Sequence, residues 1–222
     1  MLEILQSDDH SYRLNIFGFS GAPGLTQNVA LLDQRMAVEW VHENIAAFGG
    51  DPEHITIFGQ SAGGASVDYY SYIWTEKPLV SGLISHSGTA LSFKPNTAEE
   101  SASYFYHVSK TLDCGDSGDD VEEVVKCLRK QSYGDILKAV AKVPAASSPT
   151  IPQPVFHPTV DDVTVFGDYA ERSAAGKFAK VVSLQALKFH HSGQELTPPS
   201  HICATVTKTR PATTASMPSP PV

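Results

Sequence analysis

The segment Ile55–Gly64, ITIFGQSAGG, constrains the fold of this chain more than any other. Its first four residues are β-branched or aromatic, as in a short strand buried in the middle of a parallel sheet. The residues after Ser61 are mostly small and predict a helix that runs towards Trp74. The sequence therefore predicts a serine on a tight turn between a buried strand and a helix.

Strand and helix patterns alternate on both sides of this turn. Tyr12–Phe19 has the alternating polar and apolar residues of a strand, and Leu83–Ser85 predicts another strand, which Gly88 closes. Helical spacing continues between Glu99 and Val143 and returns over Glu171–Phe178. Such alternation indicates the α/β class, with a mostly parallel central sheet and flanking helices.

The longest predicted helix precedes the serine. We expect Asn28 to cap it, and Gly49-Gly50 to end it after about five turns. The apolar residues that recur at helical spacing along it, and that predict its buried face, are Val29, Leu32, Met36, Trp40, Val41, Ile45 and Phe48.

Charge and hydropathy argue against two kinds of partner. The 222 residues include 16 Lys+Arg and 24 Asp+Glu, a net charge of −8, whereas nucleic-acid binding requires clustered basic side chains. No apolar run reaches the roughly 18 residues of a membrane span. Met1–His10 also lacks the basic start and apolar centre of a signal peptide. We therefore expect no nucleic acid and no membrane span.

The turn itself contains the candidate catalytic residues. Gly59-x-Ser61-x-Gly63 matches G-x-S-x-G, the nucleophile elbow of the α/β-hydrolase fold. A serine on so sharp a turn has a strained backbone, so its neighbours must be small, and its hydroxyl projects above the sheet. The Ala62 N–H at the start of the helix can then donate to an oxyanion. The alternative is an ordinary turn serine in a glycine-rich loop that holds a phosphate.

The sequence around the turn resembles a known protein family. Residues 28–67, together with YRLNIFGF at 12–19 and SHSGTA at 85–90, resemble the type-B carboxylesterase family, which includes the cholinesterases. DYYSYIW at 68–74 is most similar to the fungal carboxylesterases. PVFHPTVDD at 154–162 and SAAGKFAKV at 173–181 extend the resemblance, which runs from Ser11 to Val181.

The resemblance implies a partial α/β-hydrolase fold, cut at both ends. We expect three parts: an atypical N-terminal extension (1–10), a partial carboxylesterase domain (11–181) and a tail (182–222). The tail holds six Pro and eleven Ser and Thr, a composition that predicts disorder.

Several residues acquire roles through the resemblance. Ser61 is the expected nucleophile and Ala62 the expected oxyanion donor, supported by Gly59, Gln60, Gly63 and Gly64; many relatives have Glu where this chain has Gln60. Ser87 resembles a buried serine near the catalytic acid, although a turn serine before Gly88 fits the sequence equally well. Cys114 and Cys127 could by spacing be a disulfide or two buried thiols, and the resemblance implies the disulfide.

The partners of the serine are not matched. In this fold the acid and the histidine follow the serine in the chain. No residue matches either one, and Met1–His10 contains no H-G-G-G oxyanion loop. Residues with suitable side chains elsewhere are expected to be solvated or to belong to a non-catalytic loop: Asp161, Asp162, His190, His191, Glu195 and His201.

The expected function is hydrolysis of small-molecule carboxylic esters through an acyl-enzyme at Ser61, impaired because the acid, the histidine and the Gly-rich loop are missing. The alternatives are a non-catalytic binding relative and an inactive fragment. No metal or organic cofactor is expected, since the chemistry needs only side chains and water and the cysteines lack the tight pairs of a metal site. Relatives of this family are commonly secreted.

Overall fold

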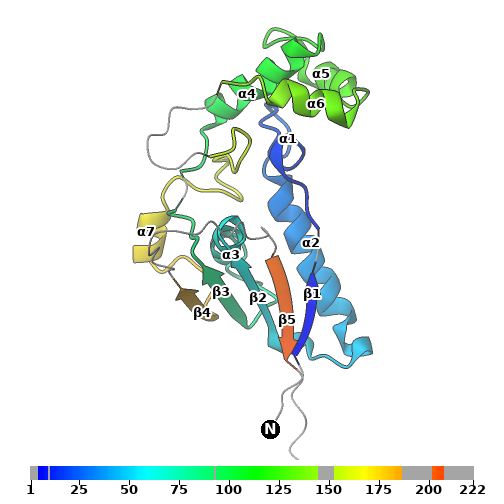
Figure 1. Ribbon diagram of the computed structural model, residues 1–222. Helices are drawn as coiled ribbons and strands as arrows, with labels where there is room; N and C mark the ends of the chain where they lie inside the picture. Colours follow the sequence, from blue (N-terminus) through cyan, green and yellow to red (C-terminus); the bar gives the residue numbers. More distant parts are fainter. Residues whose placement is uncertain (1–4, 10, 93, 145–152, 187–201, 208–222) are drawn as a thin grey trace, which may run out of the picture.

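A five-stranded sheet organises the chain (Figure 1). The computed structural model describes residues 5–9, 11–92, 94–144, 153–186 and 202–207. The strand order is β1-β5-β2-β3-β4, in which β2, β3 and β4 run parallel and β5 is antiparallel to both β1 and β2. The strands are β1 (Leu5–Asp9), β2 (Ile55–Gln60), β3 (Gly82–His86), β4 (Val182–Ala186) and β5 (Ile202–Thr207).

Both ends of the chain contribute to this sheet. β1 lies within the N-terminal extension, and β4 and β5 lie within the stretch expected to be a disordered tail. The average composition of residues 182–222 conceals a local run of β-branched residues in Ile202–Thr207. That run supplies the hydrogen-bonding partner that β2 needs along its second edge. Residues 187–201 and 208–222 lie outside the described residues, so the expectation of disorder stays a prediction there.

The core between the sheet and its helices follows the alternation of β2. Ile55 and Ile57 point to one face, where they are almost completely buried. They pack there against α2 (Val29–Asn44) through Val38 and against α3 (Ala62–Ile73) through Val67. Thr56 and Phe58, on the opposite face, stay partly exposed, so β2 is central in the sheet without being buried on both faces.

Helix α2 has the predicted extent but a buried face that differs in part from the predicted one. It continues as a 3-10 turn to Phe48 and ends at Gly49, which has φ 81°. Met36, Trp40 and Phe48 are 67%, 53% and 62% exposed, so the prediction that they belong to the core face is wrong, whereas Val41 and Ile45 of the same series are buried. The face that packs on the sheet carries Ala30, Leu31, Gln34, Arg35, Val38 and Val41.

A buried arginine explains the rotation of this face. The Arg35 guanidinium donates to the Tyr70 hydroxyl (2.7 Å) and the Lys77 carbonyl (3.0 Å), and it pairs with Glu39. It also lies over the Trp74 ring, 4.5 Å from the centroid. Because the cation has hydrogen-bond acceptors, an ion-pair partner and an aromatic ring beside it, a charged residue occupies a core position that an apolar pattern assigns elsewhere.

Asn28 precedes α2 as predicted, but its side chain does not cap the helix. It has φ 53° and is 1% exposed. Its amide instead makes a two-way pair with the backbone of Thr159, with bonds of 2.8 Å in both directions, and also donates to Thr164. The side chain therefore joins two segments that are 131 residues apart.

The predicted strand over Tyr12–Phe19 is wrong, because the structure has a short helix, α1 (Asn15–Gly18), within it. Asn15 has φ 55°, which turns the chain out of the extended conformation. Gly18 then packs so closely on Arg13 that a Cβ there would collide with the Arg13 carbonyl. The chain folds back on itself over this segment, where a strand would continue straight.

The remaining helices form a separate group at one end of the molecule (Figure 1). They are α4 (Ala98–Thr111), α5 (Val121–Leu128) and α6 (Tyr133–Val140), and they surround their own apolar core around Phe105 and Val108. Helix α7 (Tyr169–Ala174) lies outside this group and ends four residues before the predicted limit at Phe178.

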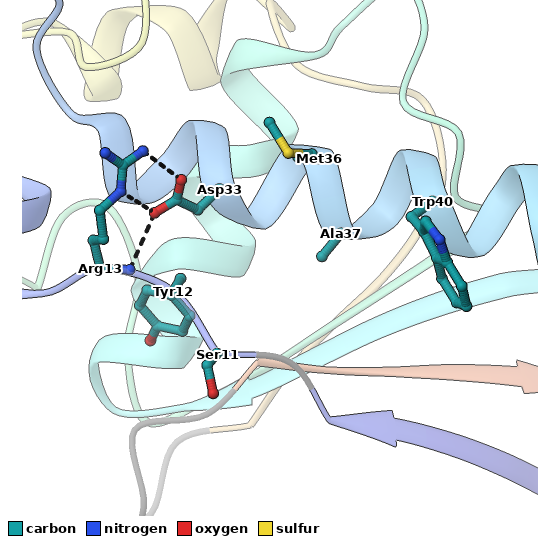
Figure 2. Close-up of a pocket in the computed structure, with 7 residues that line it drawn as sticks. All are labelled: Ser11, Tyr12, Arg13, Asp33, Met36, Ala37 and Trp40. Carbon is teal, nitrogen blue, oxygen red and sulfur yellow. Dashed lines mark hydrogen bonds and ion pairs between the residues drawn. The ribbon is translucent and has the colours of Figure 1, made fainter.

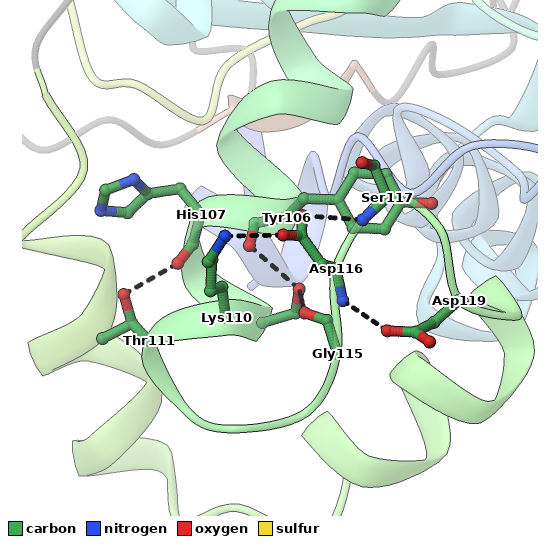
Figure 3. A network of polar contacts seen from close by, with 9 residues as sticks. Tyr106, His107, Lys110, Thr111, Gly115, Asp116, Ser117 and Asp119 are labelled. Atoms are coloured by element: carbon green, nitrogen blue, oxygen red, sulfur yellow. Dashed lines mark hydrogen bonds and ion pairs between the residues drawn. The ribbon is translucent and has the colours of Figure 1, made fainter.

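The disulfide predicted between Cys114 and Cys127 is present and ties the start of the α4–α5 loop to α5. The same loop is held by polar contacts (Figure 3). Lys110 pairs with Asp116 at 2.7 Å, and the Asp116 N–H donates to the Asp119 carboxylate at 2.8 Å. The loop is therefore fixed both covalently and by hydrogen bonds.

Candidate active site

Ser61 lies between the end of β2 and the start of α3, in a conformation that L-residues rarely adopt. Its dihedral angles are φ 55° and ψ −118°. Two backbone hydrogen bonds hold it there: the Ser61 N–H donates to the His86 carbonyl at 2.8 Å, and the Ala65 N–H donates to the Ser61 carbonyl at 3.0 Å. The end of β3 and the first turn of α3 therefore impose the strained turn, which agrees with the expected elbow.

Three glycines permit this arrangement. A Cβ on Gly59 would overlap the Gly63 carbonyl, and a Cβ on Gly88 would overlap the Ser61 carbonyl. A Cβ on Gly64 would lie 2.8 Å from the His86 oxygen. These contacts are all to backbone atoms, which cannot move aside, so the small residues of the motif are required where β2, α3 and the end of β3 meet.

The end of β3 completes the support. The buried Ser85 hydroxyl contacts the Gly64 carbonyl at 2.9 Å and also the Gly88 carbonyl, so it joins β3 to α3. Ser87, two residues later, is partly buried and has φ 52°. Its role beside a catalytic acid stays a prediction.

The two residues next to Ser61 face different surroundings. Ala62 is exposed and begins α3, whose first N–H groups have no carbonyl partner within the helix and carry the positive end of its dipole. An anion forming at Ser61 would meet this end of the helix. Gln60 is partly buried, and its Oε1 has no hydrogen-bond partner within the described residues.

Within the part of the chain that the structure describes, no histidine or carboxylate hydrogen-bonds to the Ser61 hydroxyl. Asp161 is occupied elsewhere, because its carboxylate accepts the N–H groups of Thr164 and Val165 at 2.7 and 2.8 Å. Burial opposes the charge of Asp161, but these hydrogen bonds outweigh it and lower the pKa of the carboxyl. His190, His191, Glu195 and His201 lie outside the described residues.

One acidic residue near the elbow was not singled out from the sequence. Asp68 lies on α3, seven residues after Ser61, and its carboxylate accepts the Ala90 N–H at 2.8 Å and the Gln185 side-chain amide at 3.4 Å. Burial raises the pKa of the Asp68 carboxyl, which the bond from Ala90 only partly offsets. A single acid in the otherwise uncharged helix AGGASVDYYSYI was the signal that could have found it.

A groove of about 660 Å³ lies beside α2, away from the elbow (Figure 2). Its lining residues are Ser11, Tyr12, Arg13, Asp33, Met36, Ala37 and Trp40, and none of the elbow residues is among them. The Arg13 guanidinium makes two bonds to Asp33, at 2.6 and 2.8 Å, which keep the pKa of the Asp33 carboxyl low. Among the described lining residues, the one cationic side chain, that of Arg13, is therefore already neutralised by Asp33.

The described residues also lack a metal site and a membrane-spanning helix. No cluster of three or more His, Cys, Asp or Glu side chains there could hold a metal ion. No helix there is long and apolar enough to cross a membrane.

Comparison with known proteins identifies the family. The model of the carboxylesterase family matches residues 9–187. A chlorogenic acid esterase of Aspergillus niger is 42% identical over 175 residues, which are 77% of this chain and 32% of that protein. Secreted lipase 5 of Gibberella zeae is 38% identical over 178 residues, and the inactive carboxylesterase-like protein VdtD of Byssochlamys spectabilis is 29% identical over 183.

A solved structure gives the same result for the fold. The crystal structure of Aspergillus niger EstA, an α/β-hydrolase esterase, superposes with a TM-score of 0.64 at 32% identity, over 78% of this chain and 34% of EstA. The chain thus spans about a third of the length of these relatives. The matched sequence, the shared fold and the strained serine turn agree, and the chain belongs to the carboxylesterase family.

Proposed function

We propose that the protein hydrolyses small-molecule carboxylic esters, with Ser61 as nucleophile and an acyl-enzyme as intermediate. The conformation of Ser61 is the single observation that carries this proposal. A serine held at φ 55° and ψ −118° by β3 and α3 costs about 1–3 kcal/mol of strain, which a merely structural turn would avoid by using glycine.

The elbow supports the chemistry in a definite way. Attack of the Ser61 oxygen on the ester carbonyl carbon forms a C–O bond and moves the carbonyl electron pair onto oxygen. The Ala62 N–H and the positive end of α3 stabilise that oxyanion. The alcohol then leaves with a proton, and water hydrolyses the acyl-serine.

The proton of Ser61 needs a base. Within the described residues none is hydrogen-bonded to the hydroxyl, and we therefore propose that the turnover of this chain is low. In a comparable hydrolase the loss of the triad histidine lowers kcat by roughly 10⁶-fold, and what remains comes from the oxyanion hole and substrate binding. The fate of Ser61 at the first chemical step is for this reason more informative than steady-state turnover.

The names of the relatives suggest the first substrates to test. Chlorogenic acid is an ester of an aromatic acid, and the lipases in the same group indicate acylglycerols. The Cys114–Cys127 disulfide and the secreted relatives favour an oxidising compartment for the folded chain.

A second candidate is a catalytically inactive relative that retains the elbow as scaffold. The described residues favour it because they place no histidine or carboxylate on Ser61, and one of the relatives, VdtD, is named as an inactive carboxylesterase-like protein.

Reaction with a fluorophosphonate distinguishes the two. The purified chain and its Ser61→Ala variant are incubated with the probe, and the adduct is located by intact-mass and peptide mass spectrometry. One probe per chain at Ser61, absent from the variant, supports the esterase. No adduct on a chain that unfolds in one cooperative thermal transition refutes the esterase and leaves the inactive relative.

A further inference from the structure

Asp68 occupies a distinctive place on α3. It lies on α3 seven residues after Ser61, which directly precedes the helix. Its neighbours along the helix, Val67, Tyr69 and Tyr70, are all buried. Within the described residues, no lysine or arginine forms an ion pair with it. A carboxylate in such surroundings requires hydrogen-bond donors, and it has two.

The two donors come from different elements. Asp68 Oδ2 accepts the backbone N–H of Ala90, at 2.8 Å, and Oδ1 accepts the side-chain amide of Gln185, at 3.4 Å. Ala90 belongs to the loop that leaves β3, and Gln185 belongs to β4. Asp68 therefore connects the elbow helix to the two strands that follow it in the sheet.

The loop that Asp68 holds is the one that contacts the elbow. Its first part lies on the serine, because Gly88 packs directly against the Ser61 carbonyl and the Ser85 hydroxyl contacts the Gly88 carbonyl. Its second part ends at Ala90, which is 2% exposed and packs in the core with Ala65 and Tyr69. One end of the loop is fixed by close packing on the elbow, and the other by the carboxylate of Asp68.

Removing the carboxylate would leave this second end without its hydrogen bond. The Ala90 N–H would then be buried without an acceptor, a cost that the loop avoids by moving outward. Such a movement would carry Ser87 and Gly88 with it and loosen the contact that holds Ser61 in its strained conformation.

We propose that Asp68 is a positioning residue for the Ser61 site, and that it acts by anchoring residues 87–90 against the elbow. The proposal rests on the proposed esterase function for its catalytic consequence. The Asp68 side chain touches no reacting atom, so its effect on Ser61 passes through the backbone of the loop. The conservative replacement Asp68→Asn keeps a side-chain oxygen that can accept the Ala90 N–H, whereas Asp68→Ala does not.

The experiment uses the full chain and compares Asp68→Ala and Asp68→Asn with wild type. Ser132→Ala serves as a matched control, because Ser132 caps α6 in the distant helical group and its loss lowers stability without touching the loop. Amide hydrogen exchange of Ala90 reports the anchor, and the rate of fluorophosphonate labelling reports Ser61.

We expect Asp68→Ala to accelerate Ala90 exchange by at least about tenfold and to slow the labelling of Ser61 by a similar factor. Asp68→Asn keeps both rates within about threefold of wild type, and Ser132→Ala leaves Ala90 exchange unchanged. Unchanged Ala90 exchange in a folded Asp68→Ala variant overturns the proposal. So does a loss of labelling that Ser132→Ala reproduces.

Two measurements keep the test decisive if a variant fails. If Asp68→Ala does not fold, the wild-type chain alone is informative, since an Ala90 amide that exchanges as fast as an unstructured one contradicts the anchor. If wild type is not labelled at all, the esterase proposal fails, and the exchange data still test the anchor separately.

Discussion

Replacement of Ser61 by glycine is expected to stabilise the folded chain. The Ser61 backbone, at φ 55° and ψ −118°, is strained for any residue with a Cβ and relaxed for glycine. Ser61→Ala removes the same hydroxyl but keeps the Cβ, so it retains the strain. The difference between the two variants therefore isolates the backbone contribution.

The magnitude is a balance of two effects. Release of the strain contributes about 1–3 kcal/mol to folding. Glycine has more freedom in the unfolded chain, which removes roughly 0.5–1 kcal/mol. We therefore expect Ser61→Gly to be more stable than Ser61→Ala by about 1–2 kcal/mol, which in a domain of this size raises Tm by roughly 2–8 °C.

Urea unfolding followed by far-UV circular dichroism measures this difference. The two variants are compared at equal m-values, so that a shift in the midpoint reports stability alone. Both variants lack the nucleophile, so neither reacts with the fluorophosphonate. A Ser61→Gly variant that is no more stable than Ser61→Ala contradicts the argument, because the strain released would then not exceed the roughly 0.5–1 kcal/mol that glycine removes.

The other predictions concern the scaffold. Replacing both Cys114 and Cys127 by Ser is expected to cost about 3 kcal/mol, because the disulfide closes a loop across 13 positions, and reductant should lower the urea midpoint of wild type but not of the double variant. Val38→Ala should lower the free energy of unfolding by about 2 kcal/mol, because Val38 is buried, and Trp40→Gln by less than about 0.5 kcal/mol, because Trp40 is exposed. The two urea midpoints measure this contrast, which would reverse if the face of α2 that carries Trp40 packed on the core. Burial opposes the charge of Asp161, but hydrogen bonds outweigh it and keep the pKa of the carboxyl low. The ionised carboxylate therefore stabilises the folded state fully above the ordinary pKa of Asp, and this stabilisation is lost as the pH falls through the lowered pKa. Thermal unfolding from pH 6 downward should therefore show a gap between wild type and Asp161→Asn that narrows with acid, and a gap that widens would contradict this assignment.

The elbow could be predicted from sequence because its physics is local. Ser61, Gly59, Gly63 and Gly64 lie within six residues, and the collision that requires glycine at position 59 is with Gly63, four residues away. The existence and the end of α2 were predictable for the same reason, since helical spacing and Gly49 act within a few residues. The resemblance to a family then supplied the pairing of Cys114 with Cys127, which spacing alone left open.

Tertiary structure decided what depends on partners distant in the chain. Arg35 is buried because Tyr70, Lys77 and Trp74 surround it, and these contacts turned the face of α2 that the apolar pattern had assigned to the core. Ile202–Thr207 forms a strand because the edge of β2 requires hydrogen-bonding partners, whatever the composition around it. Asp68 acquires its place from Ala90 and Gln185, which are 22 and 117 residues away. A local pattern records what a residue prefers, but the free energy of burying a charge or pairing a strand is set by the groups that the fold brings to it.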